Sequence, residues 1–371
     1  MKIRGIPYRT IWLNEDGWRV NVIDQTKLPH EFSTITLSSD HDVAHAIRTM
    51  IVRGAPLIGA AAAFGICLAM REDASNSSLV TTCKLLSRTR PTAVNLHRTL
   101  NDMKTALMNV SERERVATAY TLANDICLTD IKTNQAIGEH GFEVLRKLYT
   151  NKPPDTPLNI LTHCNAGWLA TVDWGTATAP MYSAHNAGIP IHVWVDETRP
   201  RNQGSALTAF ELAQHGVPHT VIVDNAGGHL MQNGEIDLCL VGTDRTTASG
   251  DVANKIGTYL KALAAKDNNI PFYVALPSST IDWSITDDIN EIPIEERSKE
   301  EVMYVSGRDE EGRLAKIQVT PDGSNTANYA FDVTPARLIT GLITERGMTE
   351  PSAEGLATLF PEHATQDHST I

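Results

Sequence analysis

Hydrophobic residues in the first part of the chain, up to about residue 149, recur with helical spacing. Apolar side chains three and four residues apart are typical of amphipathic or buried helices. The segments with this spacing are residues 43–50, 57–71, 95–109 and 113–149. Ahead of them, residues 10–13 and 18–23 alternate apolar and polar side chains around an Asn-Glu-Asp-Gly turn, which predicts a β-hairpin. The first part is therefore predicted to be mainly helical and to open with a small antiparallel sheet.

The pattern changes at residues 150–155, where two adjacent prolines among polar residues exclude a continuing helix. Short apolar runs follow, typical of parallel strands that are buried on both faces. The runs are residues 158–162, 191–195, 220–223, 238–241 and 272–275, and the helical segments between them are residues 168–187, 206–215 and 253–265. We therefore predict an α/β fold: a smaller, mainly helical N-terminal domain, residues 1–150, and a Rossmann-like C-terminal domain with a parallel sheet, residues 151–371.

Length and composition agree with this picture. The chain has 371 residues, which is more than one hydrophobic core usually serves. Its hydrophobic fraction of 42% and charged fraction of 20% are those of an ordinary globular protein. The longest apolar run, residues 55–70, is made of small residues and suits a tightly packed internal helix, and the N-terminus shows no signal region. We expect a soluble cytoplasmic protein with no membrane partner.

Charge and cysteine content exclude several partners and cofactors. The net charge is −12 and no block rich in lysine or arginine is present, which argues against a nucleic-acid surface. Five cysteines at scattered positions form no CxxC pair, so we predict reduced thiols and no metal site. Neither a Walker loop nor a GxGxxG motif is present, so nucleotide binding is not predicted.

Residues with functional side chains follow the predicted strands directly. In an open parallel sheet, ligands bind beyond the carboxyl ends of the strands. Cys164 follows the first strand, Gln203 lies in a polar segment after the second, and Asp244 follows the fourth. Asn254 and Lys255 come next, at the predicted start of a helix, where an amide and a cation could contact a hydroxyl or a phosphate. The ordinary alternative for Lys255 is an exposed surface lysine.

Cys164 and Asp244 each have an ordinary explanation beside a catalytic one. A buried cysteine usually serves as a small hydrophobic side chain, and a loop aspartate is commonly a helix N-cap or an ion-pair partner of a neighbour such as Arg245. A thiol between a strand end and a helix, however, feels the helix dipole, which favours the thiolate. A carboxyl group in a narrow apolar crevice has a raised pKa and can donate a proton near neutral pH.

Two arginines are candidates for anion binding. Arg53 precedes Gly54 and Ala55 at a glycine turn into a predicted helix, with a proline in the first turn, where it is tolerated. A guanidinium beside free backbone N–H groups could hold a phosphate there. Arg90 is the second candidate, and either arginine could instead form a structural ion pair.

Six separated segments resemble one enzyme family. They read RGAPLIGAAAAFG, RPTAVNL, LTHCNAG, DETRPRNQG, GTDR and NKIGTY, in that order along the chain, and IPIEER and FDVTP follow. Together they closely resemble the methylthioribose-1-phosphate isomerases of methionine salvage, over residues 52 to about 347. That family is related to the regulatory subunits of the guanine-nucleotide exchange factor for eukaryotic translation initiation, which share the fold without the chemistry.

The resemblance implies an aldose-ketose isomerase that converts 5-methylthioribose 1-phosphate into 5-methylthioribulose 1-phosphate. It implies Cys164 and Asp244 as the catalytic pair, a homodimer and no cofactor. The residues that it implies for binding the sugar phosphate are Arg53, Gly54, Ala55, Arg90, Gln203, Asn254 and Lys255.

One departure concerns Arg201 and Asn202, where other branches of the family have apolar or different polar residues. Related ribose-1,5-bisphosphate isomerases have an arginine nearby. The alternatives are therefore the same chemistry on 5-deoxyribose 1-phosphate or on ribose 1,5-bisphosphate. An apolar pocket would favour a methylthio or deoxy substrate, and a second cationic cluster with Arg201 would favour the bisphosphate. A non-catalytic regulatory protein is the alternative from another class, and the presence of Cys164 and Asp244 argues against it.

Overall fold

The computed structural model describes residues 1–285 and 291–363, so the end of the predicted C-terminal domain, residues 364–371, lies outside the described part. Residues 1–150 contain the helices α1 (Asp40–Arg48), α2 (Ala55–Glu72), α3 (Asn76–Ser87), α4 (Val94–Met108) and α5 (Glu112–Tyr149). All but α3 were predicted, with ends that differ by at most three residues. Helix α3 buries only Leu79, Thr82 and Leu86, a stripe too sparse to predict from apolar spacing.

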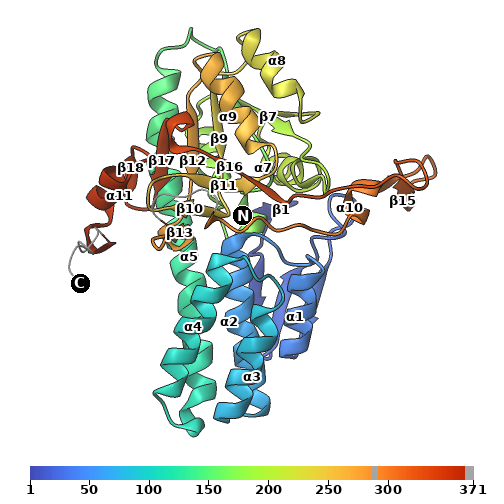
Figure 1. The fold of residues 1–371 in the computed structure, drawn as a ribbon, viewed down its shortest axis with the longest axis vertical. Coiled ribbons are helices and arrows are strands. Elements are labelled where there is room, and N and C mark those ends of the chain that lie inside the picture. Colours follow the sequence, from blue (N-terminus) through green and yellow to red (C-terminus); the bar gives the residue numbers. More distant parts are fainter. Residues whose placement is uncertain (286–290, 364–371) are drawn as a thin grey trace.

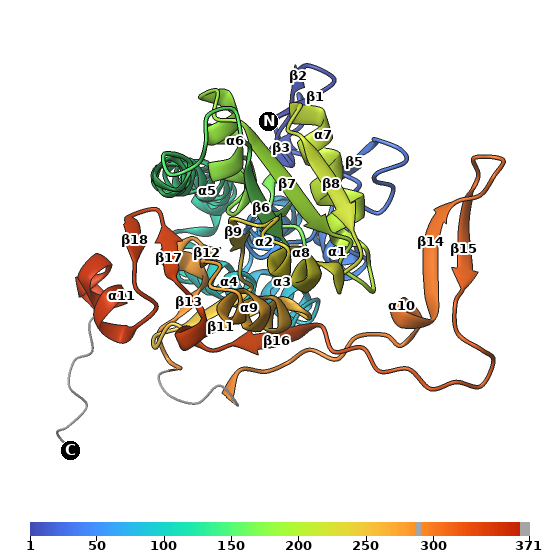
Figure 2. The same cartoon turned by 90° about the horizontal axis from the view of Figure 1, so that it is seen from above.

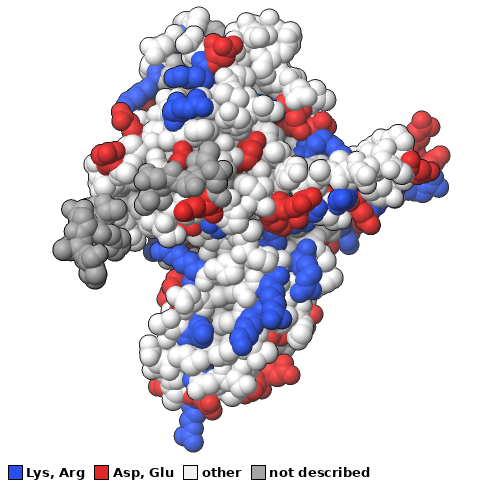
Figure 3. Space-filling view, viewed as in Figure 1, with Lys and Arg blue, Asp and Glu red and all other residues white. Residues whose placement is uncertain are grey.

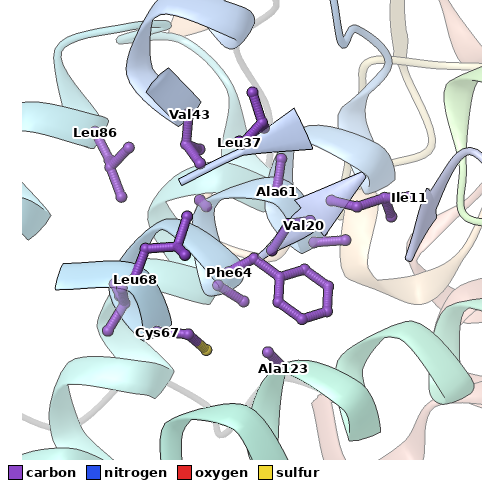
Figure 4. Packing of buried hydrophobic residues seen from close by; sticks show 14 of the residues in the cluster. Ile11, Val20, Leu37, Val43, Ala61, Phe64, Cys67, Leu68, Leu86 and Ala123 are labelled. Atoms are coloured by element: carbon purple, nitrogen blue, oxygen red, sulfur yellow. The ribbon is translucent and has the colours of Figure 1, made fainter. Parts of the chain in front are cut away.

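Helix α2 is the centre of the helical half. Every residue from Leu57 to Met70 is buried, because alanine and glycine let the neighbouring helices approach closely. A Cβ at Gly59, for example, would lie 2.9 Å from the hydroxyl of Thr99 in α4. Figure 4 shows Phe64 of α2 among the side chains of the surrounding cluster. The helix has the length and apolar composition of a membrane span, but 78% of that stretch is buried inside the molecule, as in a core helix.

Small antiparallel sheets open the chain, as predicted. Strands β3 (Ile11–Leu13) and β4 (Val20–Ile23) form the expected hairpin. A third strand, β5 (Thr34–Leu37), joins β4 on its other side, and β1 (Lys2–Ile3) pairs with β2 (Ile6–Pro7). Strands β3 to β5 pack with the helical half, where Ile11, Val20 and Leu37 contribute to its core, whereas β1 contacts α7 (Ala209–His215).

A seven-stranded sheet with the order β18-β17-β12-β9-β6-β7-β8 forms the other half (Figure 1). The five predicted runs are β6 (Leu158–Thr162), β7 (Ile191–Asp196), β8 (His219–Ile222), β9 (Leu238–Val241) and β12 (Phe272–Ala275), all mutually parallel. Strand β17 (Gly341–Thr344) adds a parallel strand, and β18 (Gly347–Thr349) pairs with it antiparallel. Helices α6 (Thr178–Asn186), α7 (Ala209–His215), α8 (Ala226–Gln232) and α9 (Thr258–Asp267) lie between strands in the chain. The predicted Rossmann-like sheet is confirmed.

Two predicted helices are wrong in part. Residues 168–187 begin with a 3-10 turn, Trp168–Ala170, and α6 starts only at Thr178, because a left-handed backbone at Gly175 interrupts the segment. Residues 253–265 begin as strand β11 (Val252–Lys255), and Gly257, with φ +103°, separates it from α9. Strand β11 belongs to a second sheet, with the order β13-β10-β11-β16, that the apolar pattern did not reveal. Its other strands are β10 (Arg245–Thr247), β13 (Ile281–Asp282) and β16 (Phe331–Thr334).

A β-hairpin projects from the α/β half as an arm (Figure 2). It consists of β14 (Tyr304–Arg308) and β15 (Leu314–Gln318), with the short helix α10 (Glu300–Met303) at its base. Arg199 donates to the carbonyl of Val302 at 2.9 Å, and Arg308 donates to the carbonyl of His30 at 2.6 Å. The arm is thus tied to the body at its base and to the first segment of the chain. Helix α11 (Ala353–Leu359) packs at the opposite edge, against β18.

The hydrophobic clusters do not divide cleanly at the predicted domain boundary, because α5 contributes to two of them. One cluster joins α1 to α4, the first part of α5 and β3 to β5. A second cluster lies at the central sheet and includes Ile3, Ile23 and the last turns of α5, at Val144 and Leu145. Helix α5 therefore runs along both halves, as Figure 1 shows. The division of the chain at residue 150 stays a prediction.

Candidate active site

A pocket lies beyond the carboxyl ends of three neighbouring strands. Strand β6 lies between β7 and β9 in the sheet: the chain adds β7 and β8 on one side of β6 and then β9 and β12 on the other. Open α/β sheets bind ligands at such a reversal of strand order. Cys164 after β6, Gln203 after β7 and Asp244 after β9 all line the pocket, whose volume is about 690 Å³ with the open space at its mouth. The expected convergence of thiol and carboxyl group in one cavity is confirmed. Their catalytic roles stay a prediction.

The helical half supplies the opposite wall through the start of α2. Arg53, Gly54 and Ala55 line the pocket, and the predicted glycine turn with a proline in the first helical turn is present. Gly54 has φ +92°, and a Cβ there would lie 2.5 Å from the Cα of Ala170. Only glycine permits this approach, which brings the N-terminus of α2 against the segment after β6.

Arg53 is oriented by a buried polar network. Its guanidinium donates to the side-chain oxygen of Asn165 and, at 2.8 Å, to the carbonyl of the same residue. The amide of Asn165 in turn donates to Thr208 at 3.1 Å and to Glu211 at 3.0 Å. Burial raises the pKa of Glu211 to about 7, although hydrogen bonds from Asn165 and others and the charge of Arg53 oppose the shift. These contacts hold the cation at the pocket wall.

Cys164 has an unusual backbone conformation and is held by several hydrogen bonds. Its φ is +70°, a left-handed conformation that L-residues rarely adopt. Thr198 accepts a hydrogen bond from its N–H at 2.9 Å, and Thr208 donates to its carbonyl at 2.7 Å. The thiol faces the side-chain oxygen of Gln203 at 3.6 Å. These contacts fix the thiol in the pocket.

The predicted helix-dipole effect on Cys164 is wrong, because the segment after it forms a 3-10 turn and α6 starts 14 residues later, at Thr178. Burial raises the pKa of the Cys164 thiol, while the cations of Arg53 and Lys255 lower it and the charge of Asp244 raises it. The neutral thiol is therefore the main form near neutral pH.

Asp244 behaves as the sequence predicts. Burial raises the pKa of its carboxyl group, although Lys255, Arg90 and Arg53 lower it. Its N–H donates to the carbonyl of Ala253 at 3.0 Å, which ties the loop after β9 to strand β11. A carboxyl group with a raised pKa is suited to donating a proton to a bound substrate.

Lys255 lies in strand β11, so its predicted place at a helix start is wrong. The side chain is buried, and its ammonium is 5.0 Å from the centre of the Phe331 ring. Burial lowers the pKa of Lys255, and the charges of Cys164 and Asp244 raise it. The lysine is thus a pocket cation and not the exposed surface residue of the alternative explanation.

Asn254 precedes Lys255 in β11 and does not line the pocket, whereas Ala253 and Lys255 do. Successive side chains of a strand point to opposite faces, which explains the difference. The amide of Asn254 donates to Thr258 at 3.0 Å. Its predicted contact with substrate stays a prediction.

Arg90 enters the pocket from the turn between α3 and α4. Its guanidinium forms an ion pair with Glu295 at 2.9 Å. Its Nε–H is buried and has no acceptor within residues 1–285 and 291–363. Arg90 is therefore both a structural ion-pair partner and a pocket cation whose Nε–H group can still donate a hydrogen bond.

Sequence reasoning missed the apolar part of the pocket. These lining residues come from four separate parts of the chain and are Met50, Ile58, Ala93, Ile292, Pro293 and Phe331. Four of the resembling segments, RGAPLIGAAAAFG, RPTAVNL, IPIEER and FDVTP, contain five of these residues, so the resemblance was a signal that could have found them. Their apolar side chains form a place for an uncharged substituent.

Arg201, the residue that could have indicated a bisphosphate substrate, does not line this pocket. It lines a wider outer cleft between the arm and the first segment of the chain, and its guanidinium pairs with Glu301 at 3.0 Å. No second cationic cluster with Arg201 therefore lines the inner pocket in the described part of the chain.

A group of side chains typical of metal ligands lies behind Cys164. His163, Asp196 and Asp224 have donor atoms within 4.8 Å of one another. His163 contacts Asp196 at 2.8 Å through Nδ1 and the carbonyl of Ile256 at 2.8 Å through Nε2. Lys261 forms an ion pair with Asp196 at 3.1 Å. The cation within this group is thus the chain's own ammonium, and the group supports the loop that carries Cys164.

Comparisons with known proteins agree with this geometry. The model of the initiation factor 2 subunit family matches residues 51–351. The methylthioribose-1-phosphate isomerase of Paramagnetospirillum magneticum is 62% identical, with 98% of this chain and 100% of the relative covered. The enzyme of the same name from Brucella anthropi is 60% identical, again over 98% and 100%.

Two solved structures are similarly close in fold. The 5-methylthioribose 1-phosphate isomerase from Pyrococcus horikoshii has a TM-score of 0.82 and 38% identity, over 98% of this chain and 100% of that one. A protein from A. fulgidus described as translation initiation factor eIF-2B, subunit delta, has a TM-score of 0.79 and 38% identity, over 96% and 100%. Fold likeness alone does not separate the two descriptions, whereas relatives at about 60% identity carry one name. The chain therefore belongs to the initiation factor 2 subunit family and, within it, to the methylthioribose-1-phosphate isomerases.

Proposed function

We propose that the protein isomerises 5-methylthioribose 1-phosphate to 5-methylthioribulose 1-phosphate. The observation that carries the proposal is that Cys164 and Asp244, from neighbouring strands, line one pocket with the cations Arg53, Arg90 and Lys255. The full-length relatives named for this activity support the same conclusion.

The three cations and the start of α2 are suited to holding the phosphate of the substrate. Guanidinium groups bind phosphate oxygens through paired N–H donors, and the backbone N–H groups at a helix N-terminus favour an anion. Arg53 and Arg90 lie on the side of the helical half and Lys255 on the side of the second sheet. The phosphate would thus be held between the two halves of the molecule.

Asp244 is proposed as the acid of the reaction. The phosphate on the anomeric oxygen prevents the sugar ring from opening spontaneously, so a proton must be delivered to the ring oxygen. Burial raises the pKa of the Asp244 carboxyl group, so it retains its proton to a higher pH than an exposed carboxyl group does. Hydrogen then moves from C2 to C1 of the opened sugar.

Two routes for this hydrogen transfer are distinguished by the role of Cys164. In the proton-transfer route, the thiolate removes the C2 proton and an enediol intermediate is protonated at C1. In the hydride route, hydrogen moves with its electron pair from C2 to the electron-poor C1 left by ring opening, the C2 hydroxyl gives its proton back to the Asp244 carboxylate, and the thiol only stabilises the transition state. The raised pKa of Cys164 favours the hydride route, since the thiolate is the minor form. Turnover in deuterium oxide separates the routes, because only proton transfer places solvent deuterium at C1.

The apolar lining favours a substrate with an uncharged group at C5. Ile58, Ile292 and Phe331 would contact a methylthio or methyl group favourably, whereas a second phosphate would lose its hydration without a matching cation. Since Arg201 is paired with Glu301 in the outer cleft, ribose 1,5-bisphosphate is the weakest of the three candidate substrates.

A comparative assay tests the proposal. Purified protein is incubated with 5-methylthioribose 1-phosphate, 5-deoxyribose 1-phosphate and ribose 1,5-bisphosphate, and each ketose product is identified by mass and NMR. We expect the highest kcat/KM with the methylthio substrate, because its larger apolar group buries more surface. Absence of turnover with all three compounds would overturn the proposal in favour of a non-catalytic regulatory role.

The remaining expectations from the resemblance belong to the same proposal. We propose a cytoplasmic homodimer whose reaction uses no cofactor, with the nine residues implied by the resemblance as the site. Pocket contacts support eight of them, and Asn254 is supported only by its position in β11 beside Lys255.

A further inference from the structure

One segment of the chain, residues 292–297, both lines the pocket and pairs with a pocket cation. Ile292 and Pro293 line the pocket, and Glu295 lies two residues after Pro293. Glu295 receives an ion pair from Arg90 at 2.9 Å through one carboxylate oxygen and one from Arg297 at 2.9 Å through the other. Thr92, two residues after Arg90, also reaches Glu295, at 3.5 Å. Glu295 thus joins the helical half to the segment of residues 292–297.

Arg90 has the donors that a substrate phosphate needs. Its guanidinium carries five N–H groups, and its contact with Glu295 uses only the Nη2 nitrogen. The buried Nε–H has no acceptor within residues 1–285 and 291–363, which is costly unless a ligand completes it. The arginine is therefore restrained at its Nη2 group, while its Nε–H group lacks an acceptor.

We propose that Glu295 is a positioning residue for substrate binding: it fixes one edge of the Arg90 guanidinium so that the remaining donors are available to the phosphate. This inference rests on the proposed function. An arginine restrained in this way loses less side-chain freedom when the phosphate binds, so the same contacts give a higher affinity.

Glu295 also contributes to the charge balance around Asp244. The charged groups with the largest effects on Asp244 are Lys255 from β11, Arg90 from the turn before α4, Arg53 from the start of α2, and Glu295 itself; the thiol of Cys164 also interacts with Asp244. The cations lower the pKa of Asp244 and Glu295 raises it. Removing the charge of Glu295 should therefore lower the pKa of Asp244, and an activity that requires protonated Asp244 should fall at a lower pH. The shift of the pH profile reports this charge effect, and the change in KM reports the positioning of Arg90.

The test compares Glu295→Ala and Glu295→Gln with the control Glu301→Gln. Glu301 is a suitable control because it also pairs with Arg297, at 2.8 Å, but its charge is not among the largest effects on Asp244. For each protein, kcat and KM are measured across pH with 5-methylthioribose 1-phosphate. Affinity for inorganic phosphate is measured by calorimetry, and thermal unfolding verifies the fold.

We expect both Glu295 variants to raise KM and to weaken phosphate binding by roughly tenfold, the usual effect of losing one charged hydrogen bond. The decrease in kcat should be smaller, and the alkaline limb of the pH profile should move to lower pH. Glu301→Gln should leave all three unchanged. The inference is overturned if folded Glu295→Ala keeps the parental KM and pH profile, or if Glu301→Gln changes both as strongly. If the parent protein itself shows no turnover, the proposed function fails instead, and that result is separate from a change in phosphate affinity.

Discussion

At the scale of single residues, burial and nearby cations have opposite effects on the pKa values of the two proposed catalytic groups. Burial raises the pKa of both Asp244 and Cys164, and nearby cations lower both. The effect differs for the two groups because a raised pKa makes a carboxyl group a better-populated acid, but makes a thiol a less-populated base. Asp244 is therefore the group whose electrostatic setting matches its proposed role, and Cys164 fits best as a neutral neighbour of the reacting carbons.

This contrast predicts the outcome of two substitutions. Asp244→Asn and Cys164→Ser should each fold normally and lower kcat, and Asp244→Asn by about 10² to 10⁴, the usual worth of a general acid. In the parent protein, kcat should fall as pH rises through the raised pKa of Asp244, because the proton is then lost, and this decline should be absent from the residual activity of Asp244→Asn. Steady-state kinetics and melting curves check both points, and near-normal turnover in both variants would disprove the assignment of the pair.

At the scale of elements, the site depends on close approach between the start of α2 and the segment after β6. Gly54 makes this possible, since a side chain there would overlap the backbone of Ala170. The same segment includes Cys164, so the position of α2 and the position of the thiol are coupled. The second sheet acts similarly, because β11 presents Lys255 to the pocket while β10 and β16 hold that strand on both sides.

Gly54→Ala should therefore destabilise the fold by roughly 3 kcal/mol or more, from backbone strain at positive φ together with steric overlap. Gly188→Ala is the matched control: Gly188 has a similar φ of +79°, but a Cβ there meets no described atom within 4 Å. Its cost should be about 1 kcal/mol, from strain alone. Urea unfolding measures both, and equal costs for the two variants would show that the contact with Ala170 is unimportant.

At the scale of the whole molecule, the pocket lies between the helical half and the α/β half, and α5 runs along both (Figure 1). On the face shown in Figure 3, acidic and basic side chains are mixed over the upper half and the arm, and a short row of basic side chains crosses the helical half. Under the proposed function, a negatively charged protein would thus hold its anionic substrate through a few local cations in a pocket.

The buried network beneath Arg53 links the pocket to global stability. Glu211 is fully buried and accepts hydrogen bonds from Asn165, Trp168, Leu169 and Tyr182, at 2.9 to 3.1 Å. Its pKa is raised from 4.5 to about 7, so the folded protein binds a proton there that the unfolded chain has already released between these pH values. Stability therefore falls as pH rises through this window.

Glu211→Gln should remove that part of the pH dependence. A shift of this size corresponds to roughly 3 kcal/mol at most, so the free energy of unfolding of the parent, relative to the variant, should decrease by up to that amount between pH 5 and pH 8. The variant should be less stable overall, because an amide cannot accept all four hydrogen bonds. Urea unfolding at both pH values measures the difference, and parallel pH dependences would contradict the linkage.

The sequence alone determined the elements with strong periodicity and the positions of the chemistry. The five parallel strands are recognisable because burial on both faces requires unbroken apolar runs, and Cys164, Gln203 and Asp244 were found because ligand sites follow such strands. The hairpin of β3 and β4 and most helices of the first half were found from spacing in the same way. Strand β11 was taken for a helix, because its four buried residues carry no alternation.

Only the tertiary structure decided the composition of the pocket and its electrostatics. Met50, Ile58, Ile292 and Phe331 are far apart in the chain, and no local pattern shows that they meet. The absence of a helix directly after Cys164 and the depth of burial reverse the predicted effect on the thiol. Charge and burial depend on what surrounds a group in three dimensions, so the sequence could identify the reacting side chains but not their protonation.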